Sequence, residues 1–231
     1  MKKAIGIIGG MGPLATVDLF KKIVIHTKAA SDSDHIRIFI DNNPQIPDRT
    51  ESILHNGRSP VPSIVDSANH LIELGSDLLL IPCITSHFFF GEIQMRCRVP
   101  VVNMLEETMA FLKENNLNKA FLFATTGTIS TGVCNTYARK HGIELIVPNP
   151  IDQQCVMDLI YSGVKKADSK YDTRRIQEML DDICIHRNLP VVLGCTELPI
   201  AVETYGLKGV FVDTTLILAK KAIEYAGYER I

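Results

Sequence analysis

Two cysteines of this 231-residue chain stand in matching sequence contexts. Cys83 and Cys195 each follow a short apolar run that predicts a strand, and each has a threonine within two residues behind it, Thr85 or Thr196. In open parallel sheets, the residues just beyond the carboxyl ends of the strands line the ligand crevice. The sequence therefore predicts that both thiols lie at a ligand site.

A pair of thiols on opposite sides of a substrate can invert a carbon stereocentre. One group removes a proton from one face of the carbon, and the other returns a proton to the opposite face. A thiolate is the base and a thiol is the acid, and an ordinary cysteine pKa of about 8.5 brings both forms within reach near neutral pH. Cys83 and Cys195 would exchange these roles with the handedness of the substrate.

The cysteine set as a whole predicts reduced thiols and no metal site. The chain has six cysteines, at positions 83, 97, 134, 155, 184 and 195, with no CxxC pair and no zinc-type Cys/His spacing. Most free cysteines are small buried residues, and two buried core cysteines on strands remain the alternative interpretation of Cys83 and Cys195.

Other polar or glycine-rich segments are candidates for binding an anion. The segment 9–13, Gly-Gly-Met-Gly-Pro, lets backbone N–H groups converge at a helix start, where the helix dipole also favours negative charge, although a tight turn would explain it too. Arg49, in a polar segment after the second predicted strand, offers a planar fork for a carboxylate. Lys165 is a weaker candidate for binding the same charge. The alternative interpretation of Arg49 is a solvated loop arginine, and that of Lys165 is a surface lysine whose stem lies along apolar surface while its charged end reaches water.

The elements that must position these residues follow a βαβ pattern. Short aliphatic runs at 4–8, 36–40 and 78–81 predict strands, and amphipathic stretches at 14–27 and 62–74 predict helices. This alternation is typical of an α/β fold with a parallel sheet.

The pattern also repeats along the chain. In one order, about 110 residues apart, segment 7–12 is similar to 122–127, 79–85 to 191–196, and 100–103 to 210–213. We therefore expect two similar Rossmann-like lobes with mainly parallel sheets, related by a pseudo-twofold axis, with the active site in the cleft between them. Residues 1–103 with 214–231 would carry Cys83, and residues 104–213 would carry Cys195.

Composition restricts the class of partner. Lys and Arg total 24 against 26 Asp and Glu, so the net charge of -2 gives no general attraction to nucleic acid or to anionic membranes. No apolar run approaches the roughly 20 residues that span a bilayer, and glycines interrupt the first apolar run as in a strand. We expect a cytoplasmic protein with a small-molecule substrate, and neither a nucleic acid nor a membrane as partner.

Taken together, five segments resemble the aspartate/glutamate racemase family. They are 9–16 (GGMGPLAT), 43–50 (NPQIPDRT), 82–87 (PCITSH), 124–128 (ATTGT) and 194–197 (GCTE). The resemblance runs from residue 5 to beyond residue 213. It implies racemisation of an acidic amino acid, aspartate before glutamate, without pyridoxal phosphate or any other cofactor, by a protein that pairs as a homodimer.

The resemblance also assigns roles by position. Cys83 and Cys195 match the paired catalytic cysteines, and Arg49 and Lys165 match residues that hold the side-chain carboxylate. Positions around the α-carboxylate are Met11, Thr85, Thr125 and Thr196; Thr50, Ile84 and Ser86 complete the expected substrate-binding set, and His87 and Glu197 are candidates to tune the thiols.

One position departs from the family pattern. The family usually shows Cys-Asn-Thr where this chain has Cys83-Ile84-Thr85. An isoleucine side chain cannot make the amide hydrogen bond to substrate, so only the backbone N–H of Ile84 could serve. The preferred substrate is therefore open.

Three rival functions fit parts of the sequence. An NAD-dependent enzyme would explain the glycine pattern at 10–15, but Asp41 follows about 30 residues later instead of the roughly 20 expected for the ribose-binding acid. Hydantoin racemisation, double-bond isomerisation or decarboxylation would use one or both cysteines. A non-catalytic binder of acidic amino acids would use the same cleft, although binding alone does not need two acid/base groups.

Overall fold

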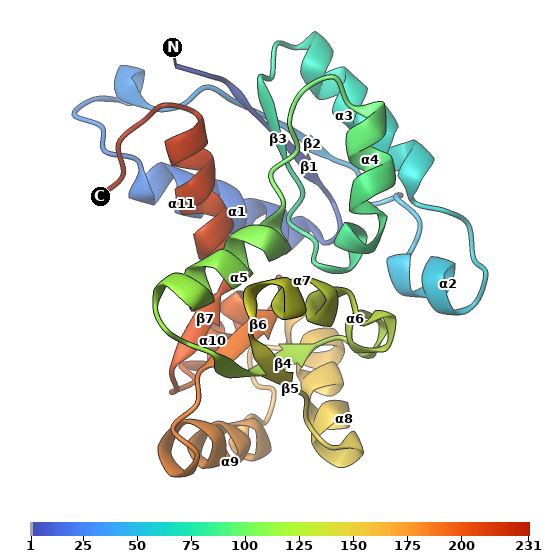
Figure 1. The fold of residues 1–231 in the computed structure, drawn as a ribbon, viewed down its shortest axis with the longest axis vertical. Coiled ribbons are helices and arrows are strands. Elements are labelled where there is room, and N and C mark those ends of the chain that lie inside the picture. The colour runs from blue at the N-terminus through green and yellow to red at the C-terminus, as the bar shows by residue number, and fades with distance from the viewer. Residues whose placement is uncertain (1) are drawn as a thin grey trace. The chain divides into compact units, whose positions relative to one another are not determined.

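The chain folds into two compact units, each with its own sheet. The computed structural model describes residues 2–231. The first unit consists of the chain up to Glu107 together with Thr215–Ile231, and the second is Thr108–Thr214. Both sheets are parallel and lie among helices, so the predicted α/β class is confirmed (Figure 1).

Two helices carry the chain across the boundary between the units. They are α5 (Met104–Glu114) and α11 (Thr214–Tyr225), and the boundary lies inside both of them. The limits predicted from the sequence, 103 and 213, are the residues that precede these two helices. The start of a helix is signalled by local residue types, whereas the boundary between two units depends on contacts between distant segments.

The first unit contains three paired strands. Its elements are β1 (Ile5–Gly9), α1 (Pro13–His26), β2 (Ile38–Asn42), α2 (Arg49–Leu54), α3 (Val61–Glu73), β3 (Leu78–Leu80), the 3-10 turn η2 (Thr85–Phe89) and α4 (Phe90–Arg96), with a further 3-10 turn η1 (Asp32–Asp34). The strand order is β2-β1-β3, and a parallel bridge from Leu79 to Val101 extends the sheet beyond β3.

The second unit contains four paired strands. Its elements are β4 (Lys119–Ala124), α6 (Thr126–Thr131), α7 (Val133–His141), β5 (Glu144–Ile146), α8 (Pro150–Asp158), the π-helical turn η3 (Leu159–Val164), α9 (Arg174–Asp181), the π-helical turn η4 (Asp182–His186), β6 (Val191–Gly194), α10 (Leu198–Tyr205) and β7 (Phe211–Asp213). The strand order is β5-β4-β6-β7.

The two sheets have the same topology. In each sheet, the first strand in sequence lies between the second and the third. The next segment then pairs with the outer side of the third strand, as Val101 does with β3 and as β7 does with β6. The three repeated sequence segments accordingly fall on β1 and β4, on β3 and β6, and on the Val101 bridge and β7. The repeat in the sequence therefore corresponds to a repeated supersecondary structure.

The sheet of the first unit is covered on both faces (Figure 1). Side chains alternate along a strand, so Ile8 points to one face and Ile5 and Ile7 to the other. Ile8 packs in a cluster that includes Leu79 and buried side chains of α3 and α4. Figure 1 shows α3 and α4 on one side of these strands and α1 and α11 on the other.

The second unit builds its main core on one face of its sheet. Phe121 and Phe123 of β4 and Val191 and Leu193 of β6 pack against buried apolar residues of α8, η3, α9 and α10. Each fully buried side chain of this size contributes about 1.5–3 kcal/mol. This core therefore holds the carboxyl ends of β4 and β6 side by side.

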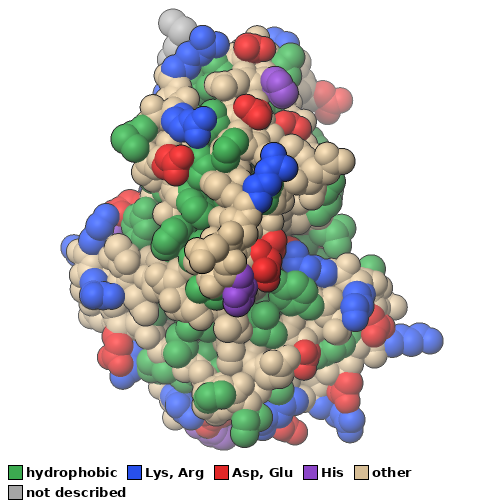
Figure 2. All heavy atoms as spheres, turned by 90° about the vertical axis from the view of Figure 1, so that its right-hand side faces the viewer, with side chains coloured by type: hydrophobic (Ala, Val, Ile, Leu, Met, Phe, Trp, Pro, Cys, Tyr) green, Lys and Arg blue, Asp and Glu red, His purple; other side chains and the backbone are tan. Residues whose placement is uncertain are grey.

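The surface shows no large area of one charge sign on the face in Figure 2, where basic and acidic side chains are interspersed. This distribution agrees with the small net charge of -2. None of the helices formed by residues 2–231 combines the length and the hydropathy that a membrane crossing needs.

His87 ties the turn after β3 to the start of α5. Its ring is buried, its Nδ1 lies 2.9 Å from the carbonyl oxygen of Cys83, and the backbone N–H of Met104 donates to its Nε2 at 3.1 Å. Because Nε2 accepts, Nδ1 carries the proton and donates to Cys83. Burial lowers the pKa of His87 to about 4, so the ring is neutral at pH 7.

The glycine loop between β1 and α1 leaves no room for a side chain at Gly10. This residue has a φ of +94°, and a Cβ there would run into the backbone of Asn43. Its backbone N–H donates to Thr16 Oγ1 at 3.0 Å, which anchors the loop on the first turn of α1. The close approach to Asn43 and the hydrogen bond to Thr16 therefore fix the conformation of this loop.

We predict that Gly10→Ala destabilises the protein more than Gly75→Ala. Gly75 also has a positive φ, +101°, but a Cβ there meets nothing within 4 Å. Gly75→Ala then carries only backbone strain of about 1–3 kcal/mol, whereas Gly10→Ala adds overpacking of about 1–3 kcal/mol. Urea unfolding of both variants measures the difference in unfolding free energy. Equal losses of unfolding free energy would contradict the prediction, because they would show that the backbone of Asn43 shifts to make room for the new Cβ.

We also predict that His87 makes the protein sensitive to acid. A histidine with a folded-state pKa of about 4 stabilises the native state fully above its unfolded pKa of about 6.5, and that stability is lost as the pH falls from about 6.5 to about 4. Between pH 7 and pH 4, the wild type should lose about 3 kcal/mol more unfolding free energy than His87→Gln.

Urea titrations at several pH values test this, with His70→Gln as the control because His70 is exposed on α3. His70→Gln should follow the wild-type curve. Parallel pH curves for wild type and His87→Gln would contradict the prediction.

Candidate active site

The predicted site residues form one group in each unit. In the first unit they lie on the segments after β1, β2 and β3, and in the second on the segments after β4 and β6 and directly after η3. Parallel pairing joins β1 to β3 and β4 to β6, so the segments that follow these strands start at the same edge of each sheet. Each unit therefore gathers its own set of candidate residues.

Cys83 follows β3 as a buried, reduced thiol. Its side chain is 5% exposed and packs in the same cluster as Met11 and Ile46, which come from the segments after β1 and β2. Its backbone N–H donates to the carbonyl oxygen of Ile81 at 2.8 Å. Three separate segments thus contribute to the cluster in which this thiol is buried.

The turn behind Cys83 contacts the glycine loop. Ser86 is fully buried, and its hydroxyl donates to Met11 Sδ at 3.3 Å. Ile84 is buried as well, so this position presents an apolar side chain where an amide was expected from the family pattern. Thr85 is half-buried at the start of η2.

His87 forms a hydrogen bond with the backbone carbonyl of Cys83 and not with its thiol. Both ring nitrogens are engaged by backbone groups, and the ring stacks on Phe90 with the centroids 5.9 Å apart. The geometry therefore favours the structural role for this histidine over direct tuning of the thiol.

Arg49 begins α2 and is held by its own loop. Its Nη1 donates to the carbonyl oxygens of Pro47 at 3.0 Å and Ile46 at 3.3 Å. Asp48 caps the helix by accepting from the backbone N–H of Glu51 at 2.9 Å. These contacts fix where the guanidinium stands, and Thr50 beside it is half-buried.

Cys195 follows β6 and is part of a short chain of polar groups. Its Sγ donates to Glu197 Oε2 at 3.0 Å, and Lys165 Nζ donates to Glu197 Oε1 at 2.7 Å. Thr196 Oγ1 lies 3.4 Å from Glu197 Oε2. Glu197 is only 4% exposed, so Lys165 supplies the opposite charge that a buried carboxylate requires.

Glu197 and Lys165 affect the protonation of the Cys195 thiol. Burial, and next the negative charge of Glu197, raise the pKa of Cys195 well above its ordinary value. Burial alone would lower the pKa of Lys165, but Glu197 holds it above the usual lysine value. At neutral pH the unit therefore contains a protonated thiol, and Lys165 is a charged ammonium.

Thr125 stands beside Cys195 at the edge of the second sheet. Ala124 pairs with Gly194, so the next residue of each strand, Thr125 and Cys195, begins the segment beyond the sheet. Thr125 caps α6, its Oγ1 accepting from the backbone N–H of Thr128 at 3.2 Å. The segment after β4 is thus a helix start, as the glycine loop is in the first unit.

Sequence reasoning did not foresee the bond between Lys165 and Glu197. The two residues are 32 positions apart, and Lys165 directly follows a π-helical turn, which no periodicity signals. Glu197 was identifiable by its place two residues after Cys195, but its partner was not.

The second unit also has a cavity of about 370 Å³ that none of the predicted site residues line. Its arginines are already paired, Arg175 with Asp152 at 2.6 Å and Arg187 with Asp182 at 2.7 Å. Within residues 2–231, no three His, Cys, Asp or Glu side chains are grouped as metal ligands would be.

Comparison with known proteins connects this fold and these residues to one family. The Asp/Glu/hydantoin racemase family model matches residues 8–222. A broad specificity amino-acid racemase, RacX of Bacillus subtilis, is 28% identical over 233 residues, covering 97% of this chain and 99% of that protein.

Solved structures agree with this match. The aspartate racemase of Picrophilus torridus superposes with a TM-score of 0.86 at 34% identity, over 99% of this chain and 96% of that one. The fold is shared with an aspartate racemase homologue of Pyrococcus horikoshii, with a TM-score of 0.79 at 22% identity over 97% of this chain and 99% of that one. The chain therefore belongs to the Asp/Glu/hydantoin racemase family, whose members are isomerases.

Proposed function

We propose that this chain racemises an acidic amino acid, aspartate in preference to glutamate, by proton transfer between Cys83 and Cys195. The observation that carries the proposal is their corresponding positions: each is a buried, reduced thiol in the segment that follows the third strand of its unit, β3 or β6, and the two sheets have one topology. The 34% identity to an aspartate racemase over nearly the whole chain supports the substrate class.

Inversion needs the two thiols on opposite faces of the substrate carbon. The proposal therefore requires that the two units face each other across the substrate, related by a pseudo-twofold axis. In one direction the Cys83 thiolate takes the α-proton and the Cys195 thiol gives its own proton to the other face of the carbanion. The products are the inverted amino acid, a Cys83 thiol and a Cys195 thiolate, and the reverse reaction restores the starting state.

The Glu197 carboxylate makes the two thiols unequal. A thiolate at Cys195 would stand about 3 Å from a carboxylate oxygen, and like charges at such a distance repel strongly in a buried site. Lys165 offsets part of this repulsion. We infer that Cys195 is the proton donor of the resting enzyme and that Glu197 and Lys165 are its positioning residues.

Both units contain groups that could bind the carboxylates of an acidic amino acid. Backbone N–H groups of the glycine loop and the hydroxyls of Thr85, Thr125 and Thr196 are placed at helix starts or just beyond strands, where a carboxylate binds well. Arg49 and Lys165 are the groups for a side-chain carboxylate.

Two features favour a second candidate, a wider range of amino acids. Lys165 already shares its charge with Glu197, which weakens its pull on a substrate carboxylate, and Ile84 replaces an amide by an apolar side chain. The relative from Bacillus subtilis is named as a broad specificity racemase. Initial rates with aspartate, glutamate and neutral amino acids decide between the two candidates.

The proposed chemistry needs no pyridoxal phosphate, metal or nucleotide, because the two thiols supply both proton transfers. We place the protein in the cytoplasm, where its six free cysteines stay reduced, and we expect it to act as a homodimer. Activity that disappears on dialysis against EDTA would contradict the cofactor-free mechanism.

We predict that Cys83→Ala and Cys195→Ala each lower the rate of racemisation by about 100- to 10,000-fold, because each removes one partner of a two-base cycle. Both variants should stay folded, since losing one sulfur costs on the order of 1 kcal/mol. Deuterium uptake from D2O into L- and D-aspartate, followed by NMR beside optical inversion, separates one-sided exchange from full inversion.

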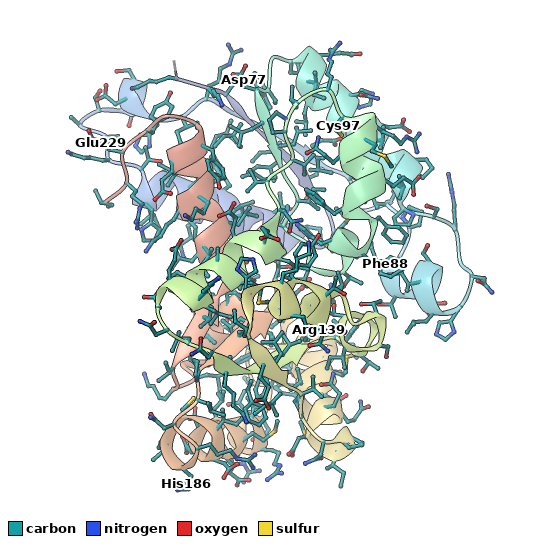
Figure 3. The ribbon with its side chains drawn as sticks, in the orientation of Figure 1. Asp77, Phe88, Cys97, Arg139, His186 and Glu229 are labelled. Atoms are coloured by element: carbon teal, nitrogen blue, oxygen red, sulfur yellow. The ribbon has the colours of Figure 1, made fainter. Side chains whose placement is uncertain are left out.

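The chain offers a matched control for each cysteine. Cys97, which caps α4 (Figure 3), and Cys134 are buried thiols whose pKa values are raised by burial, that of Cys134 to about 12. Cys97→Ala and Cys134→Ala should keep wild-type activity. A near wild-type rate in either Cys83→Ala or Cys195→Ala would overturn the two-thiol mechanism, and binding without any exchange in wild type would indicate a non-catalytic binder.

We further predict that Glu197→Gln moves the pH profile of kcat/KM toward lower pH. Removing the carboxylate charge lowers the pKa of Cys195, so a limb that needs this thiol protonated falls earlier as pH rises. Profiles for each enantiomer test this, with Glu178→Gln, an exposed glutamate on α9, as the control. A profile shifted upward or left unchanged would remove Glu197 from the proton-transfer path.

A further inference from the structure

Helix α10 and the segment that carries Lys165 are in contact at two separate places. Glu197 directly precedes α10, and its carboxylate accepts a hydrogen bond from Lys165 Nζ at 2.7 Å. Tyr205 is the last residue of the same helix, and its hydroxyl donates to the backbone carbonyl of Asp168 at 2.7 Å. One helix therefore contacts both Lys165 and the backbone three residues beyond it.

The segment between these two contacts ends the π-helical turn η3 in a strained conformation. The backbone N–H of Asp168 donates to the carbonyl of Gly163, and that of Ala167 to the carbonyl of Val164, both at 2.9 Å. This is the pattern of a Schellman cap, in which the left-handed residue is usually glycine. Here that residue is Ala167, with a φ of +53°. A residue with a side chain keeps such a conformation only where its surroundings hold it.

Two tyrosine rings supply contacts that hold this cap. A Cβ on Gly163 would lie 3.0 Å from the Tyr205 hydroxyl and 3.3 Å from Tyr171 Cγ, so both rings pack directly on the bare backbone of η3. The two rings are tilted against each other, with their centroids 6.1 Å apart. The carbonyl of Asp168 also accepts from the backbone N–H of Tyr171 at 3.3 Å. The contacts of Tyr205 with Gly163, Asp168 and Tyr171 are defined here as the tyrosine clamp.

We propose that Tyr205 is a positioning residue that, through the tyrosine clamp, holds Lys165 against Glu197. The inference rests on the proposed function, in which Lys165 acts beside Cys195. A lysine side chain loses much rotamer freedom when it is fixed in an ion pair, so the pair forms more readily from a backbone that is already held in place. Without the clamp, the strained cap relaxes, and Lys165 must reach Glu197 from a moving backbone.

The position of Lys165 matters because of its charge. Its ammonium group faces Glu197, Cys195 and the ring of Tyr161, whose centroid is 5.7 Å from Nζ. Burial and Glu197 raise the pKa of Cys195, and the positive charge of Lys165 lowers it. Displacing Lys165 therefore raises this pKa further, because the thiolate loses its nearest positive charge. The effect is opposite in sign to that of Glu197→Gln.

Two substitutions disturb the clamp from opposite sides. Tyr205→Phe removes the hydroxyl that donates to Asp168, and Gly163→Ala places a methyl group against that hydroxyl. Tyr171→Phe is the control, because it removes a hydroxyl from the adjacent ring and leaves the hydrogen bonds to Asp168 intact. Circular dichroism checks that the three variants fold.

Peptide-resolved acylation by a water-soluble N-hydroxysuccinimide ester measures how firmly Lys165 is held, since only an unpaired amine reacts. Lys113, exposed on α5, is the internal reference. We expect Lys165 to react about 2- to 10-fold faster relative to Lys113 in Tyr205→Phe and in Gly163→Ala, the range that one lost hydrogen bond allows. Tyr171→Phe should react at the wild-type rate. An unchanged rate in Tyr205→Phe, or an equal rise in Tyr171→Phe, would overturn the proposal.

The pH profile of kcat/KM provides a second readout, which a general loss of stability would not move. In Tyr205→Phe, the limb that needs a protonated Cys195 should move to higher pH, and in Tyr171→Phe it should stay in place. An unmoved limb in an active Tyr205→Phe would overturn the role of the clamp in the reaction. The acylation of Lys165 needs no racemase activity. Faster acylation in Tyr205→Phe, with a wild type that does not racemise, would support the clamp and overturn the proposed function alone.

Discussion

Parallel strand pairing is the constraint on which the rest of this structure depends. Because β1 pairs with β3 and β4 pairs with β6 in parallel, the segments that leave each pair start at one edge. The glycine loop then meets the turn that carries Cys83, through the contact of Met11 with Ser86. A single register error would send these side chains to the opposite face, because side chains alternate along a strand.

The two thiols occupy equivalent places but have different neighbours. Near Cys83, a neutral histidine holds the backbone and leaves the sulfur in a mainly apolar cluster. Near Cys195, a buried carboxylate touches the sulfur itself and is in turn held by an ammonium group. Equal topology therefore does not imply equal surroundings, and Cys195 is held in its protonated form by both burial and the negative charge of Glu197.

Burying Glu197 has a structural cost that its contacts must offset. A buried carboxylate is tolerated when it is paired and hydrogen-bonded, and Lys165, Thr196 and Cys195 together meet its oxygens. Such a group is hard to explain as a packing residue, since an apolar side chain of similar size would pack there without this cost. Its position beside the thiol supports the proposed role of Glu197 in proton transfer.

Several features of this protein were determined by the sequence itself. The alternation of aliphatic and amphipathic runs predicts the α/β class, and helices α1 and α3 begin and end within one residue of their predicted limits. The repeated segments predict the common topology of the two sheets, and they place Cys83 and Cys195 just beyond strands. These are local signals: hydrophobic periodicity, glycine loops and the apolar runs that precede each thiol.

Other features were decided only by the tertiary structure. The strand predicted at 36–40 lies at Ile38–Asn42, because its ends depend on pairing with β1. Lys165 reaches Glu197 across 32 residues, and His87 reaches the backbone of Met104 across 17. Large apolar side chains of α1 such as Val17 and Phe20 are exposed, and only the packing of the whole unit shows this. Contacts of this kind depend on how distant elements pack, and no local pattern of residue types encodes that packing.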